Sequence, residues 1–363
     1  MVVCAKAGID LIRPHMLGGA DDTAPPASIF LNSNESAYGP CPGAAAAARA
    51  AVAGVARYLE DPDRVLAPAI ARRFGLQEDR ITTGHGSDDL LARLARAYLG
   101  PGMELIRSAN GYLKVPNYAN ANDAVAVSVP DDDFKPSVDR MIAAITRRTR
   151  IVYIANPENP AGTYLTGPEV RRLHASMPED ALLVIDSAYE EYVEAADYEP
   201  AHRLVEDAAN VVMCRTFSKI FGLAGARVGW AYGPHDVMGV LRRISLTFPV
   251  AAPSVAAAVA ALEDHAHTRF VLSANSAGRR LLSAKLGALG LEVVPSQANF
   301  VLARFPDPRK SAAAAHDVLR AAGIAVRRFG SPAYRDHIRI TVGLPDELDA
   351  CVSAISSFLG ARP

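Results

Sequence analysis

The sequence predicts an α/β protein with a mostly parallel seven-stranded sheet in a large domain and a smaller α+β domain beside it. Apolar, β-branched runs recur seven times, at residues 80–84, 103–109, 124–130, 149–156, 181–188, 210–218 and 226–233. Helical stretches such as 87–99 and 167–177 separate most of these runs, as is typical of a parallel sheet covered on both faces. After residue 250, a long alanine-rich helical stretch precedes short strands at 291–296, 298–305, 325–329 and 337–343.

The beginning of the chain predicts an arm rather than a folded unit. Residues 1–40 are rich in Pro, Gly, Asn and Ser and show no sustained period. Helices are predicted at 44–59 and at 67–76, the second ended by Gly75. We therefore expect an arm that joins the small domain at 1–40, a large domain at 41–248 and the small domain itself at 249–363.

Composition narrows the class of protein. The 38 basic and 39 acidic residues leave a net charge of −1, which argues against a nucleic-acid surface. The four cysteines are scattered without a C-x-x-C pair, so neither a metal site nor a disulfide framework is expected. No apolar run approaches a membrane span, and Asp10 and Arg13 interrupt the segment where a signal peptide would stay apolar. A cytoplasmic protein without membrane partners is expected.

Two strand ends carry polar loops, and ligands bind at the carboxyl ends of strands in open α/β sheets. In TTGHGSDDLL (82–91), Gly86 allows a tight turn, and the backbone N–H groups of a helix starting at Ser87 or Asp88 form an anion site. A plain capped turn is the alternative. In NPENPAGT (156–163), two Asn-Pro pairs would hold the loop extended and direct the Asn159 amide, although an ordinary turn has the same composition.

Three further segments carry charged or aromatic groups. In VIDSAYEEY (184–192), Asp186 ends a very apolar strand, where it could meet a cationic ring nitrogen or cap a helix. In CRTFSKIFGLAGARVGW (214–230), Lys219, one of only six lysines, lies among apolar residues that would lower its pKa. Thr216, Ser218 and Arg227 in the same segment suit a phosphate. Tyr112 follows a strand and could stack on an aromatic ligand or lie in the core.

Together these features indicate one ligand, pyridoxal 5′-phosphate. Its ring nitrogen would meet Asp186, and its phenolic oxygen would meet Asn159 and Tyr189. Its aldehyde would react with Lys219. Its phosphate would bind Ser87, Thr216, Ser218 and Arg227.

The chain resembles the fold type I pyridoxal-phosphate aminotransferases, most closely the histidinol-phosphate aminotransferase group. The resemblance extends from LNSNESAYGP through RITTGHGSDD, NPENPAGT, VIDSAYEEY and RTFSKIFGLAGARVGW to PSQANFVLARF and IRITVG. It implies that the large domain binds the cofactor, with Lys219, Asp186 and Tyr189 as its catalytic residues. The implied cofactor-binding residues are Gly86, Ser87, Asp88, Tyr112, Asn159, Asp186, Tyr189, Thr216, Ser218, Lys219 and Arg227.

The resemblance also implies a homodimer and a substrate site. Tyr58 is similar to a tyrosine that reaches the phosphate from the partner subunit. Tyr38 and Asn159 are implied to line the substrate, and Arg327 and Arg339 to bind its anionic end. The family's NENPYGP, GNGSDE, NPNNPTG and DEAY occur here as NESAYGP, GHGSDD, NPENPAG and DSAY. His85, Lys114 and Ala161 near the site bear on the choice of substrate, as Arg328 does beside Arg327.

The expected reaction is ping-pong transfer of an amino group to a 2-oxo acid such as 2-oxoglutarate. Lys219 would be displaced by the substrate amine and then move a proton as general base and acid. Two or three arginines around one pocket favour histidinol phosphate as the donor. An aromatic amino acid aminotransferase and a phosphothreonine-type decarboxylase are the alternatives, and a cofactor-binding regulator without turnover is disfavoured.

Overall fold

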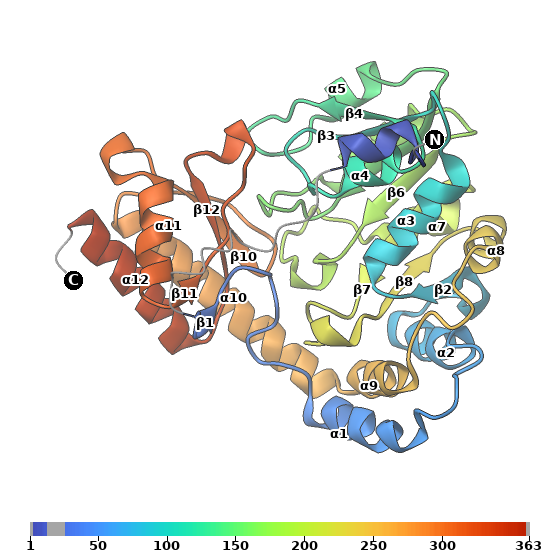
Figure 1. Ribbon diagram of the computed structural model, residues 1–363, viewed down its shortest axis with the longest axis horizontal. Helices are drawn as coiled ribbons and strands as arrows, with labels where there is room; N and C mark the ends of the chain where they lie inside the picture. The colour runs from blue at the N-terminus through green and yellow to red at the C-terminus, as the bar shows by residue number, and fades with distance from the viewer. Residues whose placement is uncertain (1–2, 13–25, 361–363) are drawn as a thin grey trace.

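The large sheet contains all seven predicted strands, in the spatial order β2-β8-β7-β6-β5-β3-β4 (Figure 1). The computed structural model describes residues 3–12 and 26–360. The strands are β2 (Ile81–Gly84), β3 (Glu104–Ser108), β4 (Val125–Val129), β5 (Thr149–Ala155), β6 (Leu182–Asp186), β7 (Val211–Thr216) and β8 (Gly229–Tyr232). Pairing is parallel from β4 through β7, and only β8 runs antiparallel to both of its neighbours. The predicted, mostly parallel sheet is confirmed.

The register of the central strands brings their carboxyl ends to one edge of the sheet. Ala155 at the end of β5 pairs with Asp186 at the end of β6, and Asp186 pairs with Cys214 in β7. Thr216 and Gly84 both pair with Gly229. The loops that follow β2, β5, β6 and β7 therefore begin side by side, and they contain the motifs singled out in the sequence.

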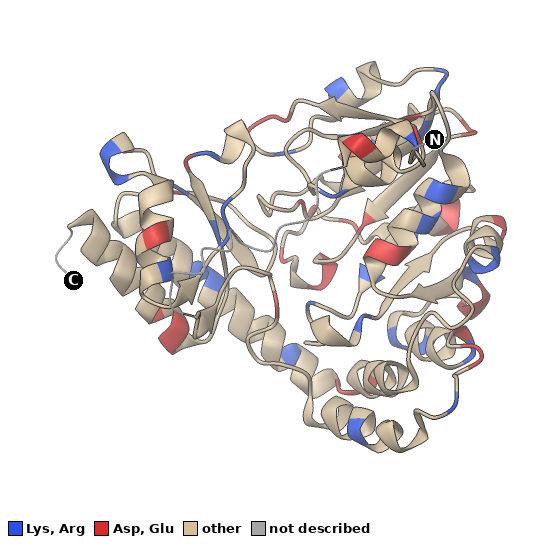
Figure 2. Ribbon diagram, viewed as in Figure 1, with Lys and Arg blue, Asp and Glu red and all other residues tan. Residues whose placement is uncertain are grey.

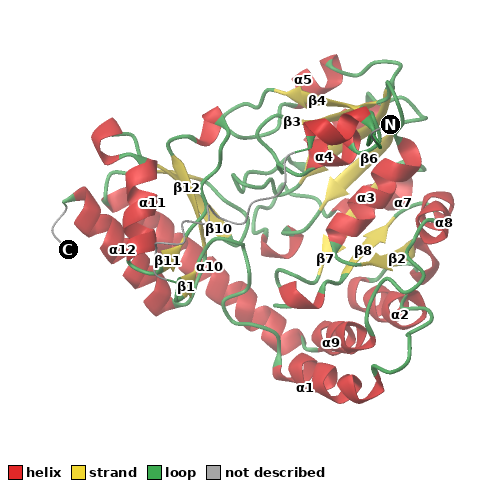
Figure 3. Cartoon of the chain, in the orientation of Figure 1, coloured by secondary structure: helices red, strands yellow, loops and turns green. Residues whose placement is uncertain are grey.

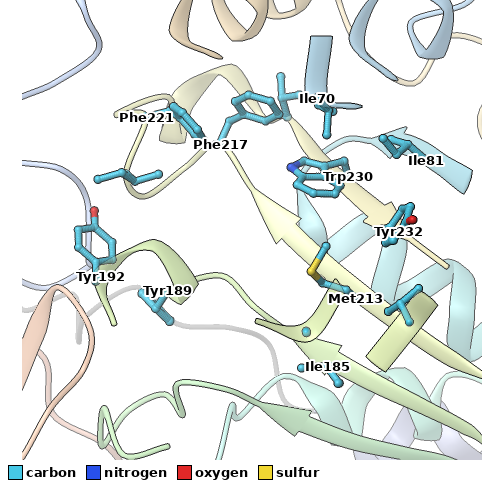
Figure 4. Close-up of a cluster of buried hydrophobic side chains, with 14 of the residues drawn as sticks. Ile70, Ile81, Ile185, Tyr189, Tyr192, Met213, Phe217, Phe221, Trp230 and Tyr232 are labelled. Atoms are coloured by element: carbon cyan, nitrogen blue, oxygen red, sulfur yellow. The ribbon is translucent and has the colours of Figure 1, made fainter. Parts of the chain in front are cut away.

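Side chains alternate between two apolar layers, one on each face of the sheet. Tyr153 and Val184 pack toward α3 (Ser87–Tyr98), α4 (Val115–Asn120) and α8 (His235–Arg243). Their neighbours Ile154 and Ile185 point to the other face, as the two-residue period of a strand requires. That face is covered by α1 (Pro42–Ala51), α2 (Asp63–Phe74), α5 (Val138–Ala143), α6 (Gly167–Ala175), α7 (Ala201–Asp207) and α9 (Ala252–Glu263). Figure 4 shows Trp230 within this layer, beside Ile81 and Tyr232.

The helix predicted at 44–59 is shorter in the structure. α1 ends at Ala51, and a 3-10 turn, Val52–Gly54, follows it. The predicted extension is wrong because Gly54 is a poor helix former and Val52 and Val55 are exposed, so no packing stabilises further turns. α2 begins at Asp63, earlier than predicted, and ends at Phe74, immediately before Gly75, whose φ of 70° suits glycine.

The C-terminal part forms a second, smaller layer of sheet and helices. After α10 (His265–Ala288), the strands β9 (Glu292–Val294), β10 (Phe300–Arg304) and β12 (His337–Thr341) pair antiparallel, with β10 in the middle. α11 (Ala312–Ala321) and α12 (Pro345–Leu359) share an apolar core with this sheet. The arm joins this part through β1 (Ile29–Phe30), which pairs with β11 (Ile324–Ala325). The exact domain boundaries stay predictions.

The two parts are connected by α10, which extends from the end of α9 toward β9 and β10 (Figure 3). Figure 2 shows that Lys and Arg residues, and Asp and Glu residues, are distributed over the helices of both parts. Among residues 3–12 and 26–360, no helix is long and apolar enough to cross a membrane.

Candidate active site

A pocket of about 440 Å³ lies at the carboxyl ends of β5, β6 and β7, between the sheet, the arm and the C-terminal part. Its walls contain most of the residues predicted from the sequence. These are Ser87, Asp88, Tyr112, Asn159, Asp186, Tyr189, Thr216, Ser218, Lys219, Arg227, Arg327 and Arg339. Segments of the arm, of the loops that follow the strands of the large sheet and of the C-terminal part therefore complete one cavity.

Lys219 is a partly buried lysine whose amine has a lowered pKa. It follows β7, where the neighbouring Phe217, Ile220 and Phe221 are buried and anchor the loop. Its Nζ donates a hydrogen bond to the carbonyl oxygen of Ser33, at 3.0 Å. Burial, aided by the positive charge of Arg339, lowers the pKa of the amine to about 8. The neutral, nucleophilic form is thus accessible near physiological pH.

A cluster of hydroxyl and guanidinium groups that suits an anion lies where β7 and α3 meet. Thr216 Oγ1 donates to Ser218 Oγ at 2.9 Å, and Arg227 Nη1 lies 3.4 Å from the same oxygen. A Cβ on Gly86, whose φ is 80°, would come within 2.5 Å of Arg227 Nη2. The guanidinium therefore lies directly against bare backbone at the start of α3, where Ser87 adds a helix N-terminus.

Asp186 is a buried carboxyl aimed at the pocket from the end of β6. Tyr153 donates its hydroxyl proton to Oδ2 at 3.0 Å, and the backbone N–H of Ala188 donates to Oδ1 at 3.2 Å. Burial raises the pKa of Asp186 to about 6 despite these hydrogen bonds. A positively charged group in the pocket would stabilise its ionised form.

Asn159 and Tyr189 approach the pocket with partners that the sequence motifs did not identify. Asn159 Oδ1 accepts a hydrogen bond from Arg339 Nη1 at 2.6 Å. The Tyr189 hydroxyl accepts from Asn34 Nδ2 at 2.9 Å, and burial raises the pKa of Tyr189 to about 12. Asn34, buried at 1% exposure, was missed; its only signal was the Asn-rich arm motif LNSNESAYGP.

Asp88 lines the pocket, but its carboxylate is held by neighbouring side chains. It accepts hydrogen bonds from Tyr112 at 3.1 Å, Tyr118 at 2.6 Å and Lys114 at 3.0 Å. These partners lower the pKa of Asp88 despite its burial. Asp88 therefore fixes the hydroxyl end of Tyr112, which orients the ring that is proposed to stack on the cofactor.

Arg327 and Arg339 form the opposite end of the pocket. They pair across two antiparallel segments through backbone hydrogen bonds of 3.0 and 2.9 Å, which places both side chains on one face. Arg339 lies over the rings of Phe300 and Phe329, and its buried Nε has no hydrogen-bond partner within residues 3–12 and 26–360. Burial lowers the pKa of Arg339 to about 10, so it keeps its charge at neutral pH. Arg328, on the other face, does not line the pocket.

Seven residues singled out in the sequence lie outside the pocket walls, namely Tyr38, Tyr58, His85, Gly86, Lys114, Ala161 and Arg328. Tyr58 is 76% exposed, with its ring stacked on Phe248 at 4.0 Å, and Tyr38 packs edge-on against Phe270. His85 is exposed beside the start of α3, and Ala161 is buried against Leu302 and Tyr334. The functional roles of Tyr38 and Tyr58 stay predictions. Phe329, Leu113 and Ser33 line the pocket and were missed.

The fold and this pocket define a class of enzyme. The family model of class I and II aminotransferases matches residues 27–355. The chain belongs to this family, and it is a pyridoxal-phosphate-dependent enzyme that transfers amino groups.

Particular relatives narrow the class. The chain is 46% identical over 357 residues to the histidinol-phosphate aminotransferase of Paramagnetospirillum magneticum, covering 98% of each chain. It is similar, with a TM-score of 0.87 and 30% identity, to the histidinol-phosphate aminotransferase from Sinorhizobium meliloti in complex with pyridoxal-5′-phosphate, covering 92% of this chain and 91% of that one. An aspartate aminotransferase from Thermus thermophilus with maleate gives a TM-score of 0.80 at 25% identity, covering 92% of each chain.

The donor set of the pocket fits pyridoxal phosphate. The subsite of Thr216, Ser218 and Arg227, with the bare backbone at Gly86, suits a phosphate. Asp186 is a buried carboxyl whose pKa burial raises, and a positively charged ring nitrogen would stabilise its ionised form. The lowered pKa of Lys219 suits an amine that attacks an aldehyde.

Proposed function

We propose that this enzyme transfers the amino group of histidinol phosphate to a 2-oxo acid such as 2-oxoglutarate. The observation that carries the proposal is the pair Arg327 and Arg339 at one end of the pocket, with Arg339 Nε left without a partner in the described part of the chain. Two guanidinium groups suit a doubly charged phosphate, and each also binds a carboxylate bidentately. Donor and acceptor can therefore use one anion site in turn. The name of the relative from P. magneticum supports the same donor.

Each of the residues in the pocket would have a separate role in the reaction. Bound pyridoxal phosphate supplies an electron-withdrawing ring that weakens the bond between the substrate's α-carbon and its proton. Asp186 would hold the proton on the ring nitrogen, and Asn159 and Tyr189 would orient the ring oxygen. Lys219 Nζ would accept the proton from the substrate carbon that bears the amino group, as general base, and would later give up a proton as general acid. Arg339 and Arg327 hold the substrate's anionic group away from this exchange.

A half-reaction screen tests the proposed donor. Histidinol phosphate, phenylalanine and tyrosine are each mixed with the purified enzyme, and the absorbance band of the bound cofactor is followed in time. We expect histidinol phosphate to discharge the band with the highest kcat/KM and 2-oxoglutarate to restore it. Faster reaction with phenylalanine or tyrosine would make the enzyme an aromatic amino acid aminotransferase. Release of CO₂ without a need for a 2-oxo acid would indicate a decarboxylase.

Substitution of Arg327 and Arg339 one at a time distinguishes their contributions to binding the anionic group of the substrate. Arg339→Ala is expected to lower kcat/KM in both half-reactions by about tenfold to a hundredfold, the value of one or two hydrogen bonds to a charged group. Arg327→Ala is expected to reduce kcat/KM for histidinol phosphate more than for phenylalanine, because the phosphate carries the additional charge. Arg328→Ala, on the opposite face, is the matched control and should leave both rates within about twofold. Equal losses from all three would contradict a specific anion site.

We further propose a homodimer in which Tyr58 acts in the site of the partner subunit. An exposed apolar surface supports this proposal, formed by Val52, Val55, Tyr58, Leu246 and Phe248, which are 54, 61, 76, 65 and 41% exposed. Surfaces of this kind are characteristic of protein interfaces. Tyr58 lies within this surface, outside the pocket of its own chain.

Mixed dimers test this arrangement. Chains carrying Tyr58→Phe are combined with an excess of chains carrying Lys219→Ala, which are inactive alone. If Tyr58 acts across the interface, each mixed dimer has one site with both defects and one with neither. The activity per Tyr58→Phe chain should then rise toward that of the wild type. Activity that stays at the Tyr58→Phe level would place Tyr58 in its own site, and sedimentation as a monomer at micromolar concentration would exclude the dimer.

A further inference from the structure

Glu158 is a buried acid beneath the pocket that the reaction does not use. It lies in the loop after β5, between Pro157 and Asn159, which line the pocket together with Pro160. Glu158 itself does not line the pocket and is only 2% exposed. The corresponding position of the family motif quoted above is an asparagine, so this carboxyl is a feature of this chain.

The carboxyl of Glu158 connects the Asn159 loop to the Tyr112 loop. Its Oε1 accepts a hydrogen bond from the backbone N–H of Asn159 at 2.9 Å. On its other side, it lies against Gly111: a Cβ added there would come within 2.8 Å of Oε2 and 2.9 Å of Oε1. Only glycine leaves room for this approach. One side chain therefore contacts the residue before Tyr112 and the backbone of Asn159.

Other side chains near this carboxyl form hydrogen bonds with the loop that contains Asn110 and Gly111. Arg107 Nη2 donates to the carbonyl oxygen of Gly111 at 3.0 Å, and the Tyr334 hydroxyl donates to the carbonyl oxygen of Asn110 at 2.7 Å. Asp131 accepts from Ser108 and from the backbone N–H of Asn110. Burial raises the pKa of Glu158 to about 8, so the neutral acid is well populated at neutral pH. A neutral side chain of this shape is tolerated in the interior because it is hydrogen-bonded.

We propose that Glu158 is a positioning residue that holds the Asn159 amide and the Tyr112 ring at the spacing needed to bind the pyridoxal ring between them. The proposal concerns the cofactor of the family and does not depend on which amine is the donor. Both held residues line the pocket, and Asn159 also contacts Arg339. Loss of the carboxyl therefore releases two walls of the ring site together.

The affinity of the full-length protein for pyridoxal phosphate tests this role. We measure the dissociation constant by absorbance titration, the position of the bound cofactor's absorption band, and Tm for Glu158→Ala and Glu158→Gln. Glu158→Ala is expected to raise the dissociation constant at least tenfold and to shift the band. Glu158→Gln keeps an acceptor oxygen and the same shape, so it should stay within threefold of the wild type.

A matched control separates positioning from general stability. Glu104 is also buried, at 3% exposure, but it lies at the opposite end of β3, where Thr146 and Arg148 are its partners. Glu104→Ala should lower Tm without changing cofactor affinity. If Glu158→Ala lowers Tm but changes neither the dissociation constant nor the band, or if Glu158→Gln is as defective as Glu158→Ala, the positioning role is wrong.

A double-mutant cycle tests the contact with Gly111, and it remains informative if Glu158→Ala folds poorly. Gly111→Ala places a methyl group against the carboxyl in the wild type and should raise the dissociation constant several-fold. In the Glu158→Ala background the methyl group meets no carboxyl, so its additional effect should be at least threefold smaller. Independent, additive effects would show that the two residues do not act through their contact.

Discussion

Lys219→Ala should abolish transamination, lowering kcat by about 10⁴-fold or more, at the upper end of what general acid–base catalysis contributes. The substitution removes both the amine that captures the cofactor and the base that moves the substrate proton. Borohydride reduction of the wild-type enzyme followed by peptide mapping should place the cofactor on Lys219 alone. Lys114→Ala is the matched control, because Lys114 also lies beside the pocket but forms an ion pair with Asp88. Label on Lys114 or Lys285 would overturn the assignment.

The same lysine predicts a pH dependence for cofactor capture. Only the neutral amine attacks an aldehyde, so the rate of capture by the apoenzyme should rise with pH and level off above about 8, the pKa to which burial and Arg339 lower Lys219. An ordinary lysine would not level off until about 10.4. Removing the charge of Arg339 should therefore move the inflection to higher pH. Stopped-flow absorbance after mixing with pyridoxal phosphate measures both profiles, and an inflection near that of free lysine would contradict the burial of the amine.

Asp186→Ala is expected to lower turnover by about 10³-fold, equivalent to about 4 kcal/mol of transition-state stabilisation. The reason is that a buried carboxylate stabilises a protonated ring nitrogen much more strongly than water does. Steady-state kinetics at saturating cofactor measures the loss. Near-normal turnover would mean that another group protonates the ring. Tyr153→Phe removes only one hydrogen bond to Asp186 and should cost far less.

Stability measurements separate this catalytic role from a structural one. Burial raises the pKa of Asp186 to about 6, above its value of about 3.9 in an unfolded chain. Asp186 therefore favours the folded apoenzyme most at low pH, and this contribution is lost as pH rises through about 6. At pH 7.5 Asp186→Ala should leave the Tm of the apoenzyme unchanged or slightly higher. A large fall in Tm at this pH would show that the carboxylate mainly supports the fold.

Much of the fold could be predicted because its signals are local. Each strand of the large sheet is an apolar, β-branched run, and such a run has to be buried whatever it pairs with. The polar residues at the strand ends could also be grouped, because parallel strands bring their carboxyl ends to one edge of the sheet. The sequence therefore predicts that Asp186, Asn159 and Lys219 share one site. The end of α1 was predicted wrongly because it depends on tertiary packing: Val52 and Val55 are exposed and do not pack against the rest of the chain.

The contacts that complete the site depend on tertiary structure. Asn34 meets Tyr189 across 155 positions of sequence, and Ser33 meets Lys219 across 186, so no local pattern records either pair. The pairing of Arg327 with Arg339, and not Arg328, follows from register between two segments, and a shift of one residue would exchange their faces. The sequence alone determined the strands, the polar loop after each strand and the class of chemistry, because these follow from residue type and local period. Only the tertiary structure decided which distant side chains share a hydrogen bond, because register and loop closure are set by the packing of the whole chain.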